Sequence, residues 1–334
     1  MKRQATIKIL LLIIVAGLTA AAQTTSQAPQ KPLTRAQILA LLAGDVPSSR
    51  VTMLVQERGI NFTSKDDFLD QVNKAGGEDD LVAALKSAKV IKNAASSSPT
   101  TGPTPNVKQE EAKDAELAQH ASQGAELMKN NHFAEAETEY RTAVKLDPDN
   151  AALHIALSRA LNAQKKTDEG MREARLAIRL NPESDLAYFS LGNSLRLQED
   201  WAGAAREYRE AIKLNPDYAM THNNLGFTLK EEGDIDGAIK EYREALRLNP
   251  REESAMANLG NALEMKGDLD GAIAQYQQIA RMRPKLGGPH FRMGQLLEKK
   301  GEPRRALAEY REAMDLAPDN PRFRAAYEHA RRNQ

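Results

Sequence analysis

Residues 219–252 read AMTHNNLGFTLKEEGDIDGAIKEYREALRLNPRE and are one copy of a unit that recurs along the chain. The period is 34 residues, and it is marked by prolines at Pro148, Pro182, Pro216, Pro250, Pro284 and Pro318. With this proline counted as position 32, the units are 117–150, 151–184, 185–218, 219–252, 253–286 and 287–320. A fixed period of this length is typical of solenoids, in which each unit packs only on its neighbours.

Each unit contains two amphipathic stretches, which we expect to form helices A and B. Positions 4, 7, 8 and 11 share one face of helix A, and positions 20, 24, 27 and 28 share one face of helix B. Glycine at position 8 and alanine at position 20 predict a close approach of the two helices, with leucine at position 11 and tyrosine at position 24 beside it. Glycine near position 15 reverses the chain in three units, and the proline ends helix B because it lacks an amide hydrogen.

This pattern resembles the tetratricopeptide repeat (TPR) family over residues 117–320. The resemblance implies an all-α fold, an α-solenoid of six 34-residue helix hairpins plus a C-terminal capping helix in 321–334, with the exposed side of helix A on the concave surface. Position 4, usually aromatic in the family, is histidine in four units, where we expect a packing role. Repeat 2 has Lys165, Gly170 and Ala174 in place of glycine, alanine and tyrosine. We therefore expect repeat 2, together with repeat 5, to be the least stable.

The first 22 residues have the layout of a secretory signal peptide: a basic start, a long apolar stretch and Ala20-Ala21-Ala22 as the cleavage site. The apolar segment 9–22 is shorter than the roughly 20 residues that span a membrane, which favours cleavage over the alternative, an inner-membrane anchor. We expect an exported chain, periplasmic or secreted, with membrane contact only through this segment if it stays uncleaved.

After a polar tail at 23–32, residues 33–92 predict a small domain of four short helices, preceding the solenoid. Thr34 and Gln37 form a capping-box pattern at its first helix. A linker rich in proline, serine and threonine follows at 93–108, so we expect this domain to be tethered to a solenoid over 109–334. Its first two helices superficially resemble a DNA-binding helix-turn-helix, but the segment lacks the basic stripe that phosphate binding needs.

The composition excludes several classes of protein. The chain has no cysteine, which excludes disulfides, thiolate metal sites and cysteine nucleophiles. Its formal net charge is zero, whereas nucleic-acid-binding domains are normally basic. The histidines at position 4 are at least one helix pair apart, too far to share a metal ion. Because no catalytic motif is present either, we expect a protein that is not an enzyme, with no cofactor, no metal and no nucleic-acid ligand.

The resemblance places positions 2, 5, 6, 9 and 12 of helix A in a concave groove, where asparagine side chains can bond a peptide backbone in either direction. The candidate residues for binding a protein or peptide are Phe189, Asn193, Arg196, Met220, Asn223, Asn224, Phe227, Lys230, Asn258, Asn261, Arg292 and Gln295. Asn224 and Asn258 resemble two rungs of the asparagine ladder of TPR glycosyltransferases. The carboxylate clamp of chaperone-binding TPR domains lacks its cations here, because Phe189, Ser254 and Asn258 occupy their places.

Two hypotheses of different class follow. The first is a non-enzymatic scaffold or adaptor that holds an extended peptide or a partner protein in the concave groove. The alternative is a structural or assembly factor of the cell envelope that acts through its convex face or its N-terminal helical domain. An enzyme accessory or carbohydrate-handling role has little support in the sequence.

Overall fold

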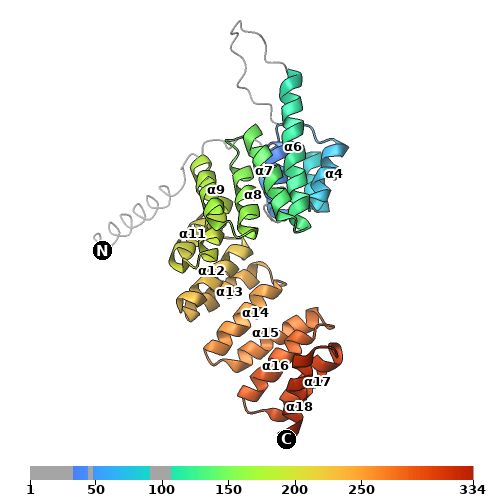
Figure 1. Ribbon diagram of the computed structural model, residues 1–334, viewed down its shortest axis with the longest axis vertical. Coiled ribbons are helices and arrows are strands. Elements are labelled where there is room, and N and C mark those ends of the chain that lie inside the picture. Colours follow the sequence, from blue (N-terminus) through green and yellow to red (C-terminus); the bar gives the residue numbers. More distant parts are fainter. Residues whose placement is uncertain (1–32, 44–47, 91–106, 334) are drawn as a thin grey trace, which may run out of the picture.

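The computed structural model describes residues 33–43, 48–90 and 107–333, and the regular elements in these ranges are α-helices (Figure 1). The predicted signal peptide, the polar tail and most of the predicted linker lie outside the described residues. In the N-terminal segment, defined as 33–90, the helices are α2 (Arg35–Ala43), α3 (Ser48–Arg58), α4 (Asp66–Lys74) and α5 (Asp79–Ser87). Among the described residues, no helix has both the length and the apolar content to span a membrane.

The repeats fold as consecutive packed helix pairs, each with helix A before helix B, and they stack into an elongated solenoid (Figure 1). The pairs are α6 (Val107–Lys129) with α7 (Phe133–Leu146), α8 (Ala151–Ala163) with α9 (Thr167–Leu180), α10 (Asp185–Leu197) with α11 (Trp201–Leu214), α12 (Ala219–Glu232) with α13 (Ile235–Leu248), α14 (Glu253–Met265) with α15 (Leu269–Met282), and α16 (Gly287–Lys299) with α17 (Pro303–Leu316). A last helix, α18 (Pro321–Arg332), packs on α17. The predicted all-α solenoid is confirmed.

Glycine at position 8 packs directly against the tyrosine at position 24 of the same repeat. A Cβ atom added to Gly226 would lie 2.8 Å from the ring of Tyr242, and one added to Gly192 would lie 2.7 Å from Tyr208. Carbon atoms cannot approach so closely without a shift of the ring, so the ring position requires glycine. Repeat 2 uses a different pair, since Ser158 and Ala174 occupy these two positions, and both are fully buried.

The turn between helices A and B has a left-handed residue at position 15 in every repeat. Glycine adopts this conformation in repeats 4 to 6, with φ of 91° at Gly233, 83° at Gly267 and 78° at Gly301. Repeats 1 to 3 make the same turn without glycine: φ is 62° at Asn131, 62° at Lys165 and 60° at Glu199. The solenoid therefore fixes this backbone geometry even where the side chain disfavours it.

The histidines at position 4 each pair with a glutamate at position 23 on helix B of the same repeat. The distances from Nδ1 to Oε2 are 2.5 Å for His120–Glu139, 2.6 Å for His154–Glu173, 2.7 Å for His222–Glu241 and 2.8 Å for His290–Glu309. In the two buried cases, Nε2 also contacts a backbone oxygen, that of Pro148 for His154 and that of Pro216 for His222. The histidine slot therefore joins the two helices of a repeat.

Burial and these hydrogen bonds act in opposite directions on the two buried histidines. Loss of water around the ring lowers the pKa of His154, but its bonds to Glu173 and to the Pro148 oxygen outweigh this and raise the pKa above its ordinary value. The same balance raises the pKa of His222, through Glu241 and the Pro216 oxygen. Both rings are therefore stabilised in their protonated form.

The N-terminal segment is closed by its own backbone contacts. The predicted capping box forms: the Thr34 amide donates to Gln37 Oε1 at 3.0 Å, and the Gln37 amide donates to Thr34 Oγ1 at 3.2 Å. Isolated parallel bridges join Leu33 to Ile60 and Ile60 to Val90. The first and last described residues of the segment therefore lie close together.

This segment does not stand apart from the solenoid. Helix α2 packs on α6 and α8, the A helices of repeats 1 and 2. One hydrophobic core contains Ile38 and Leu39 from α2 together with Ala121, Ile155 and Leu186 from the A helices of repeats 1 to 3. The predicted tether lies mostly outside the described residues, and the structure adds a direct contact, because an apolar surface of α2 is buried on the solenoid.

Candidate functional site

The predicted concave surface, which is the face of the A helices with positions 2, 5, 6, 9 and 12, is divided into two parts by the N-terminal segment. The covered groove is the concave side of α6, α8 and the start of α10, where the position 2 residues Ala118 and Leu186 are only 3% and 5% exposed. The open groove is the rest of α10 with α12, α14 and α16, where the position 2 residue Met220 is 38% exposed. Of the predicted groove residues, Met220 is exposed, Asn223 is buried and the others are half-buried.

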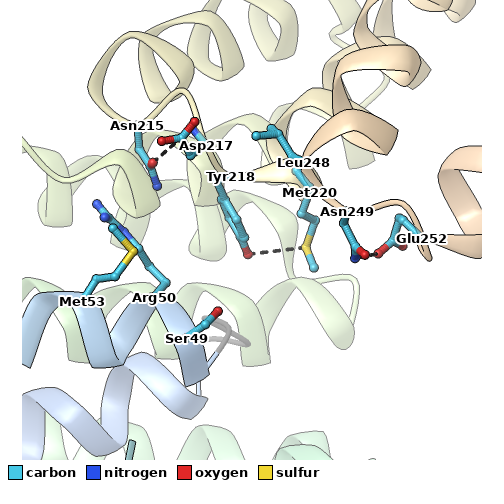
Figure 2. A pocket seen from close by; sticks show the side chains of 11 residues that line it. Ser49, Arg50, Met53, Asn215, Asp217, Tyr218, Met220, Leu248, Asn249 and Glu252 are labelled. Atoms are coloured by element: carbon cyan, nitrogen blue, oxygen red, sulfur yellow. Dashed lines mark hydrogen bonds between the residues drawn. The ribbon is translucent and has the colours of Figure 1, made fainter. Parts of the chain in front are cut away.

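A cavity of about 310 Å³ lies where the two parts meet (Figure 2). Arg50 and Met53 of α3 line one wall, and Tyr218 and Met220 at the start of α12 line the other. The Tyr218 hydroxyl contacts Met220 Sδ at 3.6 Å, and the guanidinium of Arg50 approaches Asp185 at 4.0 Å. Of these residues the sequence pointed to Met220 alone, because nothing in the repeat register indicates that α3 reaches repeat 4.

The groove asparagines bond to each other across neighbouring repeats. Asn193 Oδ1 accepts from the Tyr208 hydroxyl at 2.7 Å and from Asn224 Nδ2 at 3.0 Å. Asn258 Nδ2 donates to Asn223 Oδ1 at 3.0 Å. Each amide oxygen used in this way is less available to a ligand, whereas the Asn193 amide nitrogen keeps its two hydrogens as donors. The ladder residues are therefore inter-repeat contacts that still present donors.

The two groove phenylalanines differ in their surroundings. Phe189 is half-buried, with its ring centroid 5.9 Å from that of Tyr208 and 5.4 Å from that of Tyr218. Phe227 lies between cations instead: the Arg196 guanidinium carbon is 5.6 Å and Lys230 Nζ is 4.7 Å from its ring centroid. Cations at such distances are attracted to the π-electrons of an aromatic ring. Phe189 is thus part of the packing, and Phe227 is part of a cationic surface.

Trp201 adds a second ring to this surface, with its centroid 6.2 Å from that of Phe227 in an edge-to-face arrangement. The repeat register did not indicate it, because Trp201 is the first residue of helix B rather than a groove position of helix A. We define the cation–aromatic site as Arg196, Trp201, Phe227 and Lys230. Its residues come from two successive repeats, 3 and 4.

The far end of the open groove is neutralised by its own side chains. Arg292 donates to Glu264 at 2.7 Å, to Asn261 at 2.9 Å and to Gln295 at 2.8 Å. Lys299 also pairs with Glu264. Burial favours the neutral form of the Glu264 carboxyl, but its bonds to Lys299 and Arg292 outweigh this and lower its pKa below the ordinary value. Repeats 5 and 6 therefore offer a groove whose charges are already paired.

Among the described residues, no group of three or more histidine, aspartate or glutamate side chains is placed to hold a metal ion. What the open groove presents is hydrogen-bond donors, cations and aromatic rings. Such groups recognise a ligand by charge and shape.

Models described as tetratricopeptide repeat match residues 122–185, 223–286 and 288–320, and one described as TPR repeat matches 192–232. Among solved structures, the chain is similar to the APC/C hetero-tetramer Cut9–Hcn1, with 17% identity and a TM-score of 0.58. That alignment covers 89% of this chain and 53% of the other, so the chain spans about half the length of that relative.

A second solved structure, PilF of Pseudomonas aeruginosa, is similar with 19% identity and a TM-score of 0.55, covering 68% of this chain and 100% of that one. At these identities the likeness establishes the fold. A search of the curated proteins gives no match. TPR arrays are generally non-enzymatic scaffolds for protein–protein interaction, and the chain has that architecture. The repeat register, the glycine–tyrosine packing and the matches agree that the chain belongs to the tetratricopeptide repeat family.

Proposed function

We propose that the chain is a non-enzymatic adaptor that holds a peptide or a segment of a partner protein in the open groove. The observation that carries this proposal is the contrast in exposure at position 2 of helix A: Ala118 and Leu186 are buried in one core with the chain's own helix α2, whereas Met220 is 38% exposed. The uncovered part carries asparagine donors, a phenylalanine ring and cations, which are groups suited to peptide recognition.

We further propose that this adaptor works outside the cytoplasm. The support is the signal-peptide layout of residues 1–22 and the absence of cysteine, which makes the chain indifferent to an oxidising compartment. Fractionation of the cells that make the protein tests this point, with the amino-terminal sequence of the mature chain as the readout. A chain that begins at Gln23 in the exported fraction agrees with cleavage, and an intact Met1 in the membrane fraction agrees with the anchor instead.

Site-specific photo-crosslinking tests the groove. A benzoyl-phenylalanine is placed at Phe227 in the open groove, and in separate variants at Lys240 on α13 and at Lys86 on α5, both of which are exposed. Crosslinking is carried out in the native compartment, and adducts are identified by mass spectrometry. We expect an adduct from the groove position and none from the other two.

The alternative function makes the opposite prediction. If the protein is an assembly factor of the envelope that acts through its convex face or its N-terminal helical domain, adducts form at Lys240 or Lys86 and the Phe227 position stays unreacted. That outcome would overturn the groove proposal while leaving the fold unaffected.

A further inference from the structure

The open groove contains two stretches that differ in whether their cationic side chains form ion pairs. In repeats 5 and 6, Arg292 and Lys299 both pair with Glu264. In repeats 3 and 4, Arg196 forms no ion pair with a described residue, although its guanidinium lies beside the Tyr208 hydroxyl and over the ring of Phe227. One groove thus has a self-neutralised end and an end with an uncompensated cation.

The Arg196 side chain is also short of hydrogen-bond partners. Its Nε atom is buried and has no partner among the described residues. A buried donor without an acceptor is destabilising by about 1–3 kcal/mol, and few such groups persist in folded proteins without a reason. An acceptor supplied by a ligand is one arrangement that would satisfy the guanidinium.

The remaining groups of this stretch are donors too. Lys230 pairs with its sequence neighbour Glu231, which is exposed, at 2.6 Å, and a pair of this kind contributes little and exchanges readily. The Asn193 oxygen is saturated by Tyr208 and Asn224, which leaves its amide hydrogens for a ligand. The surface around Phe227 therefore offers mainly donors and positive charge.

We propose that the cation–aromatic site binds an acidic side chain of the partner segment, with a carboxylate held by Arg196 and Lys230 and the adjoining apolar part of the segment against Phe227 and Trp201. This inference rests on the proposed adaptor function and names the chemistry of its ligand. Guanidinium and ammonium groups bind carboxylates through charge-assisted hydrogen bonds, which are roughly twice as strong as neutral ones. The aromatic rings exclude water from that contact and so strengthen it.

The site differs in position from the carboxylate clamp that the sequence lacks. Arg196 and Lys230 both occupy position 12 of helix A, at the end of the helix that leads into the A–B turn. The cavity lined by Met53 and Met220 lies at the opposite end of α12. A segment that crosses the groove along α12 would therefore meet this cavity at one side and the cations at the other.

Selection from a displayed library of random dodecapeptides tests the proposal and does not require the natural partner. The full chain is the bait, and the affinities of the selected peptides are measured by fluorescence anisotropy at low and high salt. We expect the selected peptides to be enriched in aspartate and glutamate. We also expect a loss of at least about tenfold in affinity for the double variant Arg196→Gln, Lys230→Gln, with weaker binding at high salt.

Lys299→Gln is the matched control, because it removes a positive charge from the far end of the same groove, where the ammonium group is already paired with Glu264. We expect it to leave the affinity within about twofold of the original. Circular dichroism and thermal unfolding confirm that each variant is folded. Three outcomes would overturn the proposal. The selected peptides are not enriched in acidic residues, they bind the double variant as tightly as the parent, or they lose affinity equally for the double variant and the control.

Competition arms exclude other anions. The selected peptides are displaced with a glutamate-rich peptide, with a single-stranded oligonucleotide or with vesicles of phosphatidylglycerol. If the oligonucleotide or the vesicles displace them more effectively than the glutamate-rich peptide, the ligand is a nucleic acid or a membrane rather than a protein, and the proposal is overturned. A dimer that forms with rising concentration and is lost in the double variant would assign the site to a second copy of the chain, with the same consequence. If the crosslinker at Phe227 forms adducts but the peptide selection shows no acidic preference, the acidic ligand is rejected and the adaptor function is kept.

Discussion

The covered and the open groove are built on the same repeat but differ in what faces helix A. At repeats 1 and 2, helix α2 lies on the concave side, and Ile38, Leu39, Leu41 and Leu42 are at most 8% exposed. At repeats 4 to 6 the corresponding positions mix apolar residues, such as Met220 and Phe291, with polar ones, such as Asn258 and Arg292, that bond to neighbouring side chains. The comparison teaches that one scaffold can bind a helix of its own chain at one end while it keeps the other end available.

The largest expected effect comes from a charge placed in the covered groove. Ala121 and Ala257 both occupy position 5 of helix A, but Ala121 is fully buried whereas Ala257 is half-buried. We expect Ala121→Arg to lower the free energy of unfolding by about 3–5 kcal/mol, because its charge has no partner there. Ala257→Arg, the matched control, stays within about 1 kcal/mol of the parent.

Urea unfolding measures both effects, and limited proteolysis reports whether residues 33–90 come loose. We expect Ala121→Arg to expose the N-terminal segment to protease while repeats 4 to 6 remain protected. Equal stability of the two variants would show that α2 does not shield the covered groove in solution.

The next effect concerns the packing within single repeats. Repeat 2 has Ser158 with Ala174, whereas repeat 4 has Gly226 with Tyr242. We expect Gly226→Ser to lower the free energy of unfolding by about 1–3 kcal/mol, because the new side chain meets the Tyr242 ring. In the double variant with Tyr242→Ala, we expect the total loss to fall short of the sum of the two single losses by about 1 kcal/mol or more. Additive losses would mean that these two positions are independent.

The two buried histidines, one under the covered groove and one under the open groove, are predicted to give the folded chain a similar dependence of stability on pH. His154 lies in repeat 2 and His222 in repeat 4, with Glu173 and Asp147 near the first and Glu241 and Glu244 near the second. Both have a folded pKa above the ordinary value of 6.5, so their contribution to stability is complete below about pH 6.5 and is lost as the pH rises through the folded pKa.

Thermal melts between pH 6 and pH 9 check this. We expect the stability of the chain to fall across this interval, and we expect Glu173→Gln and Glu241→Gln each to flatten the fall by a similar amount. Stability that rises with pH over this range, or a flattening by only one of the two variants, would contradict equal roles for the two pairs.

The smallest expected effect compares two tyrosine hydroxyls. Tyr208 donates to Asn193, but the buried hydroxyl of Tyr242 has no partner among the described residues, because Phe227 stands where Asn193 stands one repeat earlier. We expect Tyr208→Phe to lower the free energy of unfolding by about 1 kcal/mol and Tyr242→Phe to leave it unchanged or slightly raise it. Chemical denaturation of the two variants measures this difference. Equal losses in the free energy of unfolding would indicate that the Tyr242 hydroxyl bonds to water.

Much of the fold follows from the repeat register. Glycine at position 8 predicted a close approach of the two helices with the tyrosine at position 24 beside it, and in five repeats the tyrosine ring lies directly against that glycine. Thr34 with Gln37 predicted the cap that forms. The burial of α2 also had a signal in the sequence. Every residue from 38 to 43 is apolar, and a helix that is apolar all round is normally buried on all sides.

The candidate site was predicted only in part. The register identified the groove positions, but it did not reveal that Asn224 bonds to Asn193 or that Arg292 is neutralised by Glu264. These contacts join residues about one repeat apart in sequence, and long side chains choose among several such partners. The sequence analysis did not predict Trp201 and Met53 as site residues for a related reason, since each reaches the groove from an element outside helix A.

The sequence by itself determined the repeat, its two helices, the turn and the order of the stack, because these depend on contacts between positions at fixed spacing. Only the tertiary structure decided which part of the concave surface is occupied. The burial of α2 depends on contacts with the A helices of two stacked repeats, and no single repeat provides that surface. The same holds for the charges: whether Arg196 or Arg292 remains free for a ligand is settled by its neighbours in space.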